Sequence, residues 1–346
     1  MARTEVTVRG AGIFGLSCAW ACLKAGASVT VIDPFGPGAG ASGGLVGALA
    51  PHVPDQWNEK KQFQFESLIM AEPFWEEVED ISGRSPGYKR LGRIQPLADE
   101  KSLTLAQERA ASARTLWHGL ADWRVLPIPA QSEWAPQSPT GQVIHDTLTA
   151  RMHPRMACDA LVAAIRAKGG RVESEGPNRG AVIWATGVAG LQSLSEDSGK
   201  SLGNGVKGQA ALLAHDAHDM PQIYAGGVHV VPHEDGTVAI GSTSEREYTD
   251  PFGTDELLDD VVARAREVVP ALRGAPVIDR WAGLRPRAKT RAPVLGTWPG
   301  RPGHYIANGG FKIGFGMAPK VAQVMADLVL EGVDAVPEAF RAEALF

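Results

Sequence analysis

Apolar and polar residues at the start of the chain follow the pattern of a strand, a turn, a helix and a second strand, all within residues 5–33. The first strand begins at Val6, the helix covers Leu16–Lys24, and the second strand covers Val29–Ile32. Between the first strand and the helix, the segment Gly10–Gly15 is rich in glycine and predicts a tight turn. The chain therefore opens with a β–α–β unit.

Later segments repeat this alternation of strands and helices. The spacing of apolar residues predicts a helix over Glu59–Ser82, which we expect Pro73 to kink or split. A helix starting at Asp159 ends in paired glycines, and the apolar run before Gly187 is typical of a buried strand. Residues 304–332 predict a strand, a glycine loop and a long helix.

The pattern favours an α/β protein with an α+β second domain. A chain of 346 residues is long enough for two domains with a cleft between them. We expect a discontinuous Rossmann-like domain formed by residues 1–56, 141–200 and 290–346. A smaller substrate domain, with a mixed antiparallel sheet, would consist of residues 57–140 and 201–289.

Composition narrows the classes of function. Lys and Arg total 34 against 39 Asp and Glu, so a net charge of −5 gives no general attraction to nucleic acid or to anionic membranes. Three cysteines fit a reducing compartment, and the sequence shows no signal peptide and no membrane-spanning run, so we expect a soluble cytoplasmic protein. The histidines and aspartates of residues 215–219 fit a solvated loop, and we expect no metal site. The oligomeric state stays open and includes a homo-oligomer.

The glycine turn is a candidate dinucleotide-binding loop. Gly10, Gly12 and Gly15 form a G-x-G-x-x-G motif, which brings backbone N–H groups and the positive end of a helix to a pyrophosphate. Asp33 lies 21 residues after Gly12, at the end of the second strand, where a carboxylate can bind ribose hydroxyls. Arg9 is unusual, because this strand would ordinarily end in an apolar residue. The unit predicts dinucleotide binding without separating NAD from FAD.

Five further motifs occur along the chain: Gly40–Gly43 (GASG), Ala48–Pro51 (ALAP), Ala185–Gly187 (ATG), Trp281–Pro286 (WAGLRP) and Asn308–Lys312 (NGGFK). With these motifs the chain resembles the superfamily of D-amino acid oxidase, glycine oxidase and sarcosine oxidase over nearly its whole length. The second half is most similar to glycine oxidases of the thiamine-pathway type, whereas Gly-Phe-Lys is similar to sarcosine oxidase.

The resemblance implies FAD as the cofactor. FAD would be bound without a covalent link, because no cysteine lies where sarcosine oxidases attach their flavin. Ser42 would cap the second phosphate, and the loop at Gly309–Gly310 would present backbone N–H groups to the flavin pyrimidine. The expected FAD-binding residues are Gly10, Gly12, Ile13, Phe14, Gly15, Asp33, Pro34, Ala41, Ser42, Gly43, Ala48, Leu49, Ala185, Thr186, Gly187, Gly283, Arg285, Gly309, Gly310, Phe311, Lys312 and Ile313.

Four residues are candidates for catalysis. Arg285 would bind a substrate carboxylate, because a guanidinium pairs with it in two parallel hydrogen bonds. Lys312 would be a second carboxylate contact or would promote oxygen reduction, with a solvated loop lysine as the alternative. His229 replaces a tyrosine of glycine oxidases; it would bind a carboxylate when protonated, accept a proton when neutral, or serve only as a strand residue. His52 follows the ALAP motif, a segment that passes the flavin face in relatives.

One departure from the superfamily concerns the first domain. The stretch from Arg171 to Ala181 is too short for the three-stranded crossover that usually precedes the ATG strand. We therefore expect an abridged FAD domain.

The resemblance implies oxidation of the C–N bond of a small amino acid or secondary amine by hydride transfer to flavin N5. The products would be an imine and, with oxygen as the electron acceptor, hydrogen peroxide. Two alternatives stay open. The first is a flavin domain that acts on a modified tRNA base, but the acidic charge balance of the chain argues against binding to RNA. The second is a flavoprotein subunit of a hetero-oligomeric amine dehydrogenase.

Overall fold

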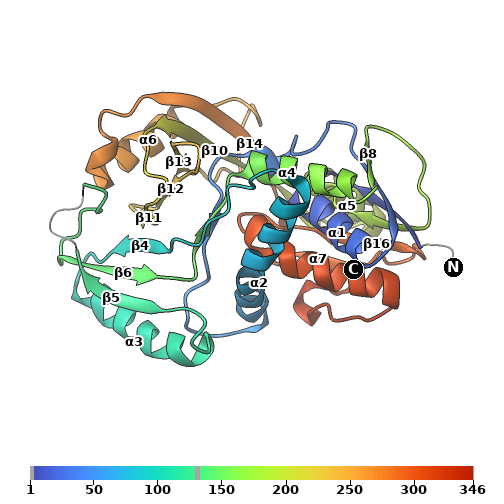
Figure 1. The fold of residues 1–346 in the computed structure, drawn as a ribbon, viewed down its shortest axis with the longest axis horizontal. Helices are drawn as coiled ribbons and strands as arrows, with labels where there is room; N and C mark the ends of the chain where they lie inside the picture. Colours follow the sequence, from blue (N-terminus) through green and yellow to red (C-terminus); the bar gives the residue numbers. More distant parts are fainter. Residues whose placement is uncertain (1–3, 129–132, 346) are drawn as a thin grey trace.

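A six-stranded sheet organises the lobe in which both ends of the chain lie (Figure 1). The computed structural model describes residues 4–128 and 133–345, so residues 1–3, 129–132 and 346 of the predicted domain ranges lie outside the described residues. The strands, in their order across the sheet, are β15 (Val294–Thr297), β16 (His304–Asn308), β9 (Ala181–Trp184), β1 (Glu5–Arg9), β2 (Ser28–Ile32) and β8 (Arg171–Glu173). All pairs are parallel except β15 with β16, as a Rossmann-like domain requires.

Three helices cover one face of this sheet: α1 (Ile13–Lys24), α4 (Pro154–Ala167) and α7 (Gly314–Glu331). Val6 and Val8 of β1 point into the apolar core beneath them. The helix α1 begins three residues before the predicted start, because Gly12 is its N-cap and Ile13 is already helical and buried. The predicted β–α–β unit is otherwise confirmed.

The helix α2 (Glu59–Ser82) is a single helix that contains Pro73, so the expectation that Pro73 splits it is wrong. A proline inside a helix removes one backbone hydrogen bond and costs about 3 kcal/mol or more. Apolar residues on both sides of Pro73, including Leu68 and Trp75, are buried in the core shared with α7 and α4. Their burial outweighs the lost hydrogen bond. The same packing places α2 against the first lobe, although the predicted range assigned it to the substrate domain.

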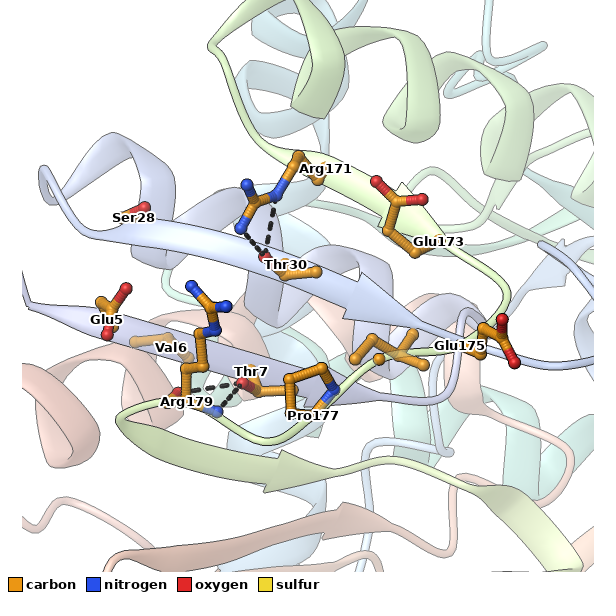
Figure 2. A pocket seen from close by; sticks show the side chains of 12 residues that line it. Glu5, Val6, Thr7, Ser28, Thr30, Arg171, Glu173, Glu175, Pro177 and Arg179 are labelled. Carbon is orange, nitrogen blue, oxygen red and sulfur yellow. Dashed lines mark hydrogen bonds between the residues drawn. The ribbon is translucent and has the colours of Figure 1, made fainter.

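On the other face of the six-stranded sheet, no helix among the described residues packs over β1, β2 and β8. Only the segment of residues 174–180 connects β8 to β9, so the predicted shortening of the crossover is confirmed. Figure 2 shows the polar side chains that line this face; Arg171 reaches Thr30, and the backbone of Arg179 both donates to and accepts from the hydroxyl of Thr7. Arg9 binds Asn178 and the carbonyl of Gly176 at 2.7 Å each, which explains the charge at the end of β1.

The second lobe contains an eight-stranded sheet. Its strands, in order, are β14 (Val277–Ala288), β10 (Gly203–Ala214), β13 (Thr237–Gly241), β12 (Val228–Pro232), β11 (Gln222–Ala225), β4 (Arg93–Pro96), β6 (Gln142–Asp146) and β5 (Trp123–Pro127). The helix α6 (Glu256–Val268) packs on β10, β12 and β13, and α3 (Glu100–Leu116) packs on β5 (Figure 1). The predicted α/β fold with a second, mixed-sheet domain is confirmed.

The predicted boundary between the substrate domain and the FAD domain, after residue 140, lies too early in the chain. Residues 142–146 form β6, which belongs to the eight-stranded sheet. Arg93 of β4 and Asp146 of β6 form a buried ion pair with an Nε–Oδ2 distance of 3.0 Å, which holds β6 in this sheet. The chain returns to the first lobe through the ribbon of β3 (Ala48–Leu49) and β7 (Ala150–Arg151).

The remaining elements are short or peripheral: α5 (Gly187–Ser198), η1 (Ala41–Gly43), η2 (Pro270–Leu272), η3 (Glu338–Phe340) and η4 (Ala342–Leu345). The helix α5 covers the part of the six-stranded sheet formed by β9 and β16, where Trp184 and Ile306 join its apolar cluster. In the part of the chain that the structure describes, no helix is both long enough and apolar enough to cross a membrane.

The buried ion pair generates the first prediction. Replacement Asp146→Ala leaves the Arg93 guanidinium buried without its partner, so we expect the free energy of unfolding to fall by about 3–5 kcal/mol. Asp122→Ala is the matched control, because Asp122 and Arg124 form an exposed pair worth at most about 1 kcal/mol. Urea unfolding of both variants measures the difference, and equal losses would contradict the structural role of the buried pair.

Candidate active site

The predicted dinucleotide loop lies between β1 and α1 and is fixed by Asp33. The backbone N–H of Ala11 donates to Asp33 Oδ2 at 2.8 Å, and the N–H of Phe35 donates to Oδ1 at 2.9 Å. Gly10 has φ +101°, and a Cβ there would overlap the carbonyl of Ala185. The conformation and the close approach both require glycine at this position.

The N-terminus of α1 points toward the GASG segment. The N–H of Ile13 donates to Ser42 Oγ at 2.9 Å, and the N-cap residue Gly12 makes no side-chain capping bond. On the other side, a Cβ at Gly310 would lie 3.0 Å from the ring of Phe14. Three predicted cofactor segments, far apart in sequence, therefore meet at the positive end of one helix, which suits an anionic phosphate.

Asn308 joins two further predicted segments. Its Nδ2 donates to the carbonyl of Gly187 at 2.8 Å, and its Oδ1 accepts from the N–H of Gly309 at 2.8 Å. The N–H of Phe311 then donates to the carbonyl of Pro286 in β14 at 3.1 Å. The ATG segment, the glycine loop and the WAGLRP strand are thus connected by hydrogen bonds at the junction of the two lobes.

The other predicted cofactor residues lie around this junction. Pro34 follows Asp33, Ala41 and Gly43 belong to η1, and Ala48 and Leu49 form β3. Thr186 is the N-cap of α5 and Ile313 is the N-cap of α7. The ring of Trp281 covers Gly283 and also approaches Gly44 just after η1. The N-terminus of α1, the Asp33 carboxylate and the closely packed glycines together fit an FAD cofactor.

Arg285 lies on β14 and is buried, with only 9% of its surface exposed. Its Nη1 donates to the carbonyl of Thr243 at 3.1 Å. Gly208 on the neighbouring strand β10 makes room for it, because a Cβ at Gly208 would overlap the guanidinium. Burial lowers the pKa of Arg285 to about 10, and the carboxylate of Glu245 partly opposes this shift. The side chain therefore carries its charge at neutral pH.

Lys312 lies on the glycine loop beside Arg285. Partial desolvation lowers the pKa of Lys312, and the positive charges of Arg285 and Arg287 act in the same direction. Its ammonium lies 5.8 Å from the centre of the Phe311 ring. The hydrogen bond from the N–H of Phe311 to the carbonyl of Pro286 places the loop of Lys312 next to the strand of Arg285, and the roles expected for the two side chains stay predictions.

His229 belongs to the same face of the eight-stranded sheet. Its ring lies 4.6 Å from the ring of Tyr224, and its buried Nδ1 has no hydrogen-bond partner within the described chain. Burial lowers the pKa of His229 to about 3, and the charges of Arg93 and Lys312 add to the effect. His229 is therefore neutral at physiological pH, so the protonated, carboxylate-binding form is disfavoured.

His52 has different neighbours from the other three candidates. Its backbone N–H donates to Gln64 Oε1 at 2.8 Å, and its Nδ1 contacts the same oxygen. Burial lowers the pKa of His52; the hydrogen bond with Gln64 opposes this, and the charges of Lys60 and Lys61 reinforce it. These contacts attach His52 to α2 and not to the group formed by Arg285, Lys312 and His229.

Three residues of the site were not assigned roles from the sequence: Gly208, Tyr224 and Asn308. A glycine in the middle of a strand signals a close approach, so Gly208 carried a usable signal. Tyr224 lies opposite His229 only because of the pairing of β11 with β12, which no local pattern specifies. Asn308 stood inside a recognised motif, but its bond to Gly187 depends on the tertiary fold.

Comparison with known proteins agrees with this geometry. The sequence profile of the family described as FAD dependent oxidoreductase matches residues 5–328. Glycine oxidase from Pseudomonas putida is 35% identical over 125 residues, which cover 36% of this chain and 34% of that enzyme. The matched segment thus spans about a third of the length of that relative.

Two solved structures are similar over almost the whole chain. Glycine oxidase from Geobacillus kaustophilus has a TM-score of 0.84 at 20% identity, and 99% of each chain is covered. Iminodiacetate oxidase from a Chelativorans species has a TM-score of 0.81 at 21% identity, with 97% of this chain and 98% of that chain covered. These likenesses show a shared fold.

The pKa of His229 generates a prediction on acid stability. Because its pKa is about 3 when folded and about 6.5 when unfolded, only the unfolded chain binds the proton between these values. Stability therefore falls as pH decreases from about 6.5, by up to about 1.4 kcal/mol per pH unit for this group. We expect His229→Gln to flatten the dependence of unfolding free energy on pH between 6.5 and 4.5.

His218→Gln is the matched control for this experiment. The hydrogen bond with Asp216 raises the pKa of the exposed His218, so its contribution is lost as pH rises and its removal does not relieve the acid loss. If His229→Gln and the wild type lose stability in parallel on acidification, His229 is not held neutral in the fold.

Proposed function

Because the chain belongs to the family of FAD-dependent oxidoreductases and uses FAD, we propose that it oxidises the C–N bond of a small amine that carries a carboxylate. The observation that carries this proposal is the placement of Arg285 on β14 next to the loop that bears Lys312, because the N–H of Phe311 donates to the carbonyl of Pro286 at 3.1 Å. Within the described residues, neither side chain forms an ion pair with an acidic group.

The electrostatics of the pair favour a bound anion. A buried guanidinium that forms no direct ion pair has lost hydration that one bond to the carbonyl of Thr243 and the charge of Glu245 replace only in part. A carboxylate would accept two parallel hydrogen bonds from Arg285 and would offset its repulsion with Lys312. The site is therefore suited to the α-carboxylate of an amino acid or of an N-substituted glycine.

His229 supplies a hydrogen-bond acceptor. Oxidation of an amine to an imine removes a hydride from carbon and a proton from nitrogen. A ring whose pKa is about 3 is too weak a base to take that proton, so we assign the proton to water and assign the unpartnered Nδ1 of His229 a hydrogen bond that orients the substrate nitrogen. When bound, FAD supplies the acceptor for the hydride and its two electrons. The imine then hydrolyses in water, and oxygen is the proposed final electron acceptor, which yields hydrogen peroxide.

Proteins of similar fold support a substrate of this size. By their names, one similar structure acts on glycine and another on iminodiacetate, both of which are small amines with carboxylates. The residues that we assign to FAD are those that meet around the N-terminus of α1 and the Gly309–Gly310 loop.

The anchoring role of Arg285 is tested directly by flavin reduction. Arg285→Ala removes the carboxylate contact, and we expect kcat/KM for amino acid substrates to fall about 100-fold or more while FAD stays bound. Stopped-flow flavin absorbance without oxygen measures the reaction, and peroxide formation is measured with oxygen. Arg280→Ala is the matched control, because Arg280 lies on the same strand and forms an exposed pair with Asp259. Unchanged turnover of every amino acid by Arg285→Ala would overturn the role.

Gly208 offers a second test that keeps Arg285 in the chain. Gly208→Ala introduces a Cβ where the guanidinium lies, so Arg285 must move. A displacement of about 1 Å at a reacting site can lower the rate about 100-fold, and we expect a loss of that size in kcat/KM. Gly274→Ala is the control, since a Cβ there meets no atom within 4 Å. Wild-type kinetics in Gly208→Ala would show that the position of Arg285 does not matter.

A further inference from the structure

We propose that Arg287 is a specificity-determining residue that, with Lys312, binds a second acidic group of the substrate. The substrate would then be an amine with two carboxylates, one held by Arg285 and the other by Arg287 and Lys312. This inference rests on the proposed function and narrows its substrate class.

The strand β14 places both arginines on the same side. Side chains alternate along a strand, so Arg285 and Arg287 share one face, with Cα atoms about 6.6 Å apart. The residue between them is Pro286, and its carbonyl accepts a hydrogen bond from the N–H of Phe311. This bond brings the glycine loop onto this part of the strand. The loop thus delivers Lys312 to the two arginines.

The ring of Phe311 lies near both Arg287 and Lys312. Arg287 Cζ lies 5.6 Å from the centre of the Phe311 ring, and Lys312 Nζ lies 5.8 Å from it. The backbone of Phe311 has φ +46°, a conformation that residues other than glycine rarely adopt. The ring is therefore held where it orients both cations, and contact with an aromatic face stabilises each of them.

The charges of Arg287 and Lys312 are not balanced by the protein. Among the described residues, neither side chain has a hydrogen bond or an ion pair, and both cations lie near the ring of Phe311. The carboxylate of Glu245 acts on Arg285 and also pairs with Lys207 at 3.4 Å, and Lys207 pairs with Asp255 at 3.2 Å as well. Arg287 and Lys312 are therefore the two cations of the site whose charge a second carboxylate would balance.

The phosphates of FAD have another place to bind. The amides at the N-terminus of α1 and Ser42 lie at the start of the glycine loop, where Gly310 touches Phe14. Phe311 and Lys312 turn from there toward β14. Arg287 and Lys312 therefore lie next to Arg285, the proposed carboxylate ligand, and guanidinium geometry suits a carboxylate.

The test compares two secondary amines in the holoenzyme: iminodiacetate, with two carboxylates, and sarcosine, with one. We expect the wild type to be reduced by iminodiacetate with a kcat/KM at least about tenfold above that for sarcosine. Arg287→Gln should lower this ratio about ten- to a hundredfold, the size expected for a hydrogen bond to a charged group. Arg280→Gln, on the same strand but outside the site, should leave the ratio unchanged.

A binding measurement separates substrate recognition from turnover. Oxydiacetate and methoxyacetate are ether analogues that cannot be oxidised as amines, and their binding is followed through the flavin absorbance spectrum. We expect oxydiacetate to bind at least about tenfold more tightly to the wild type, and Arg287→Gln to remove that preference.

Several outcomes would overturn the inference. If Arg287→Gln leaves the ratio of kcat/KM for iminodiacetate to that for sarcosine unchanged, Arg287 is not part of the substrate site. If the variant binds FAD more weakly and its FAD-bound fraction keeps that ratio, Arg287 is a cofactor residue. Reduction by sarcosine but not by iminodiacetate would overturn the second subsite and leave the proposed function standing. If no amino acid or amine reduces the flavin, the proposed function fails, and the inference fails with it.

Discussion

The hydrogen bond from the N–H of Phe311 to the carbonyl of Pro286 is the contact on which the organisation of the site depends. It attaches a loop of the first lobe to a strand of the second, so that Gly310 lies beside the dinucleotide turn while Lys312 lies beside Arg285. Phe311 takes a left-handed conformation to make it, and such strain persists only where surrounding structure determines it. Asn308 provides part of that support by joining the loop to Gly187.

The positive charge of the site follows from this attachment of the loop to β14. Cations from the two lobes come together on one face of the sheet, and a neutral histidine lies within reach of their charges. Burial, reinforced by the charges of Arg93 and Lys312, keeps His229 unprotonated, and the charge of Lys312 also attracts an anion. A single arrangement therefore prepares both a place for a carboxylate and an acceptor for a hydrogen bond.

The sequence predicts well whatever depends on local chemistry. The glycine turn, the acidic residue that ends β2 and the buried strand β9 were all recognisable because each needs particular residue types at short spacing. The sequence predicts poorly what depends on pairing between distant segments. Residues 142–146 were placed in the first domain because the pairing of β6 with β4 and β5 is not visible in the local sequence. Residues 59–82 were placed in the second domain because the apolar face of α2 does not identify its partner. Space for Arg285 at Gly208 likewise depends on strand register.

The face of the six-stranded sheet that Figure 2 shows has a consequence for how this domain is built. Threonines and arginines occupy positions that a covering layer would require to be apolar, and the short segment of residues 174–180 satisfies the buried hydroxyl of Thr7 with its own backbone (Figure 2). Both faces of the sheet are thus accounted for without a crossover. In this chain, the parallel sheet and its helices are therefore complete without that additional layer.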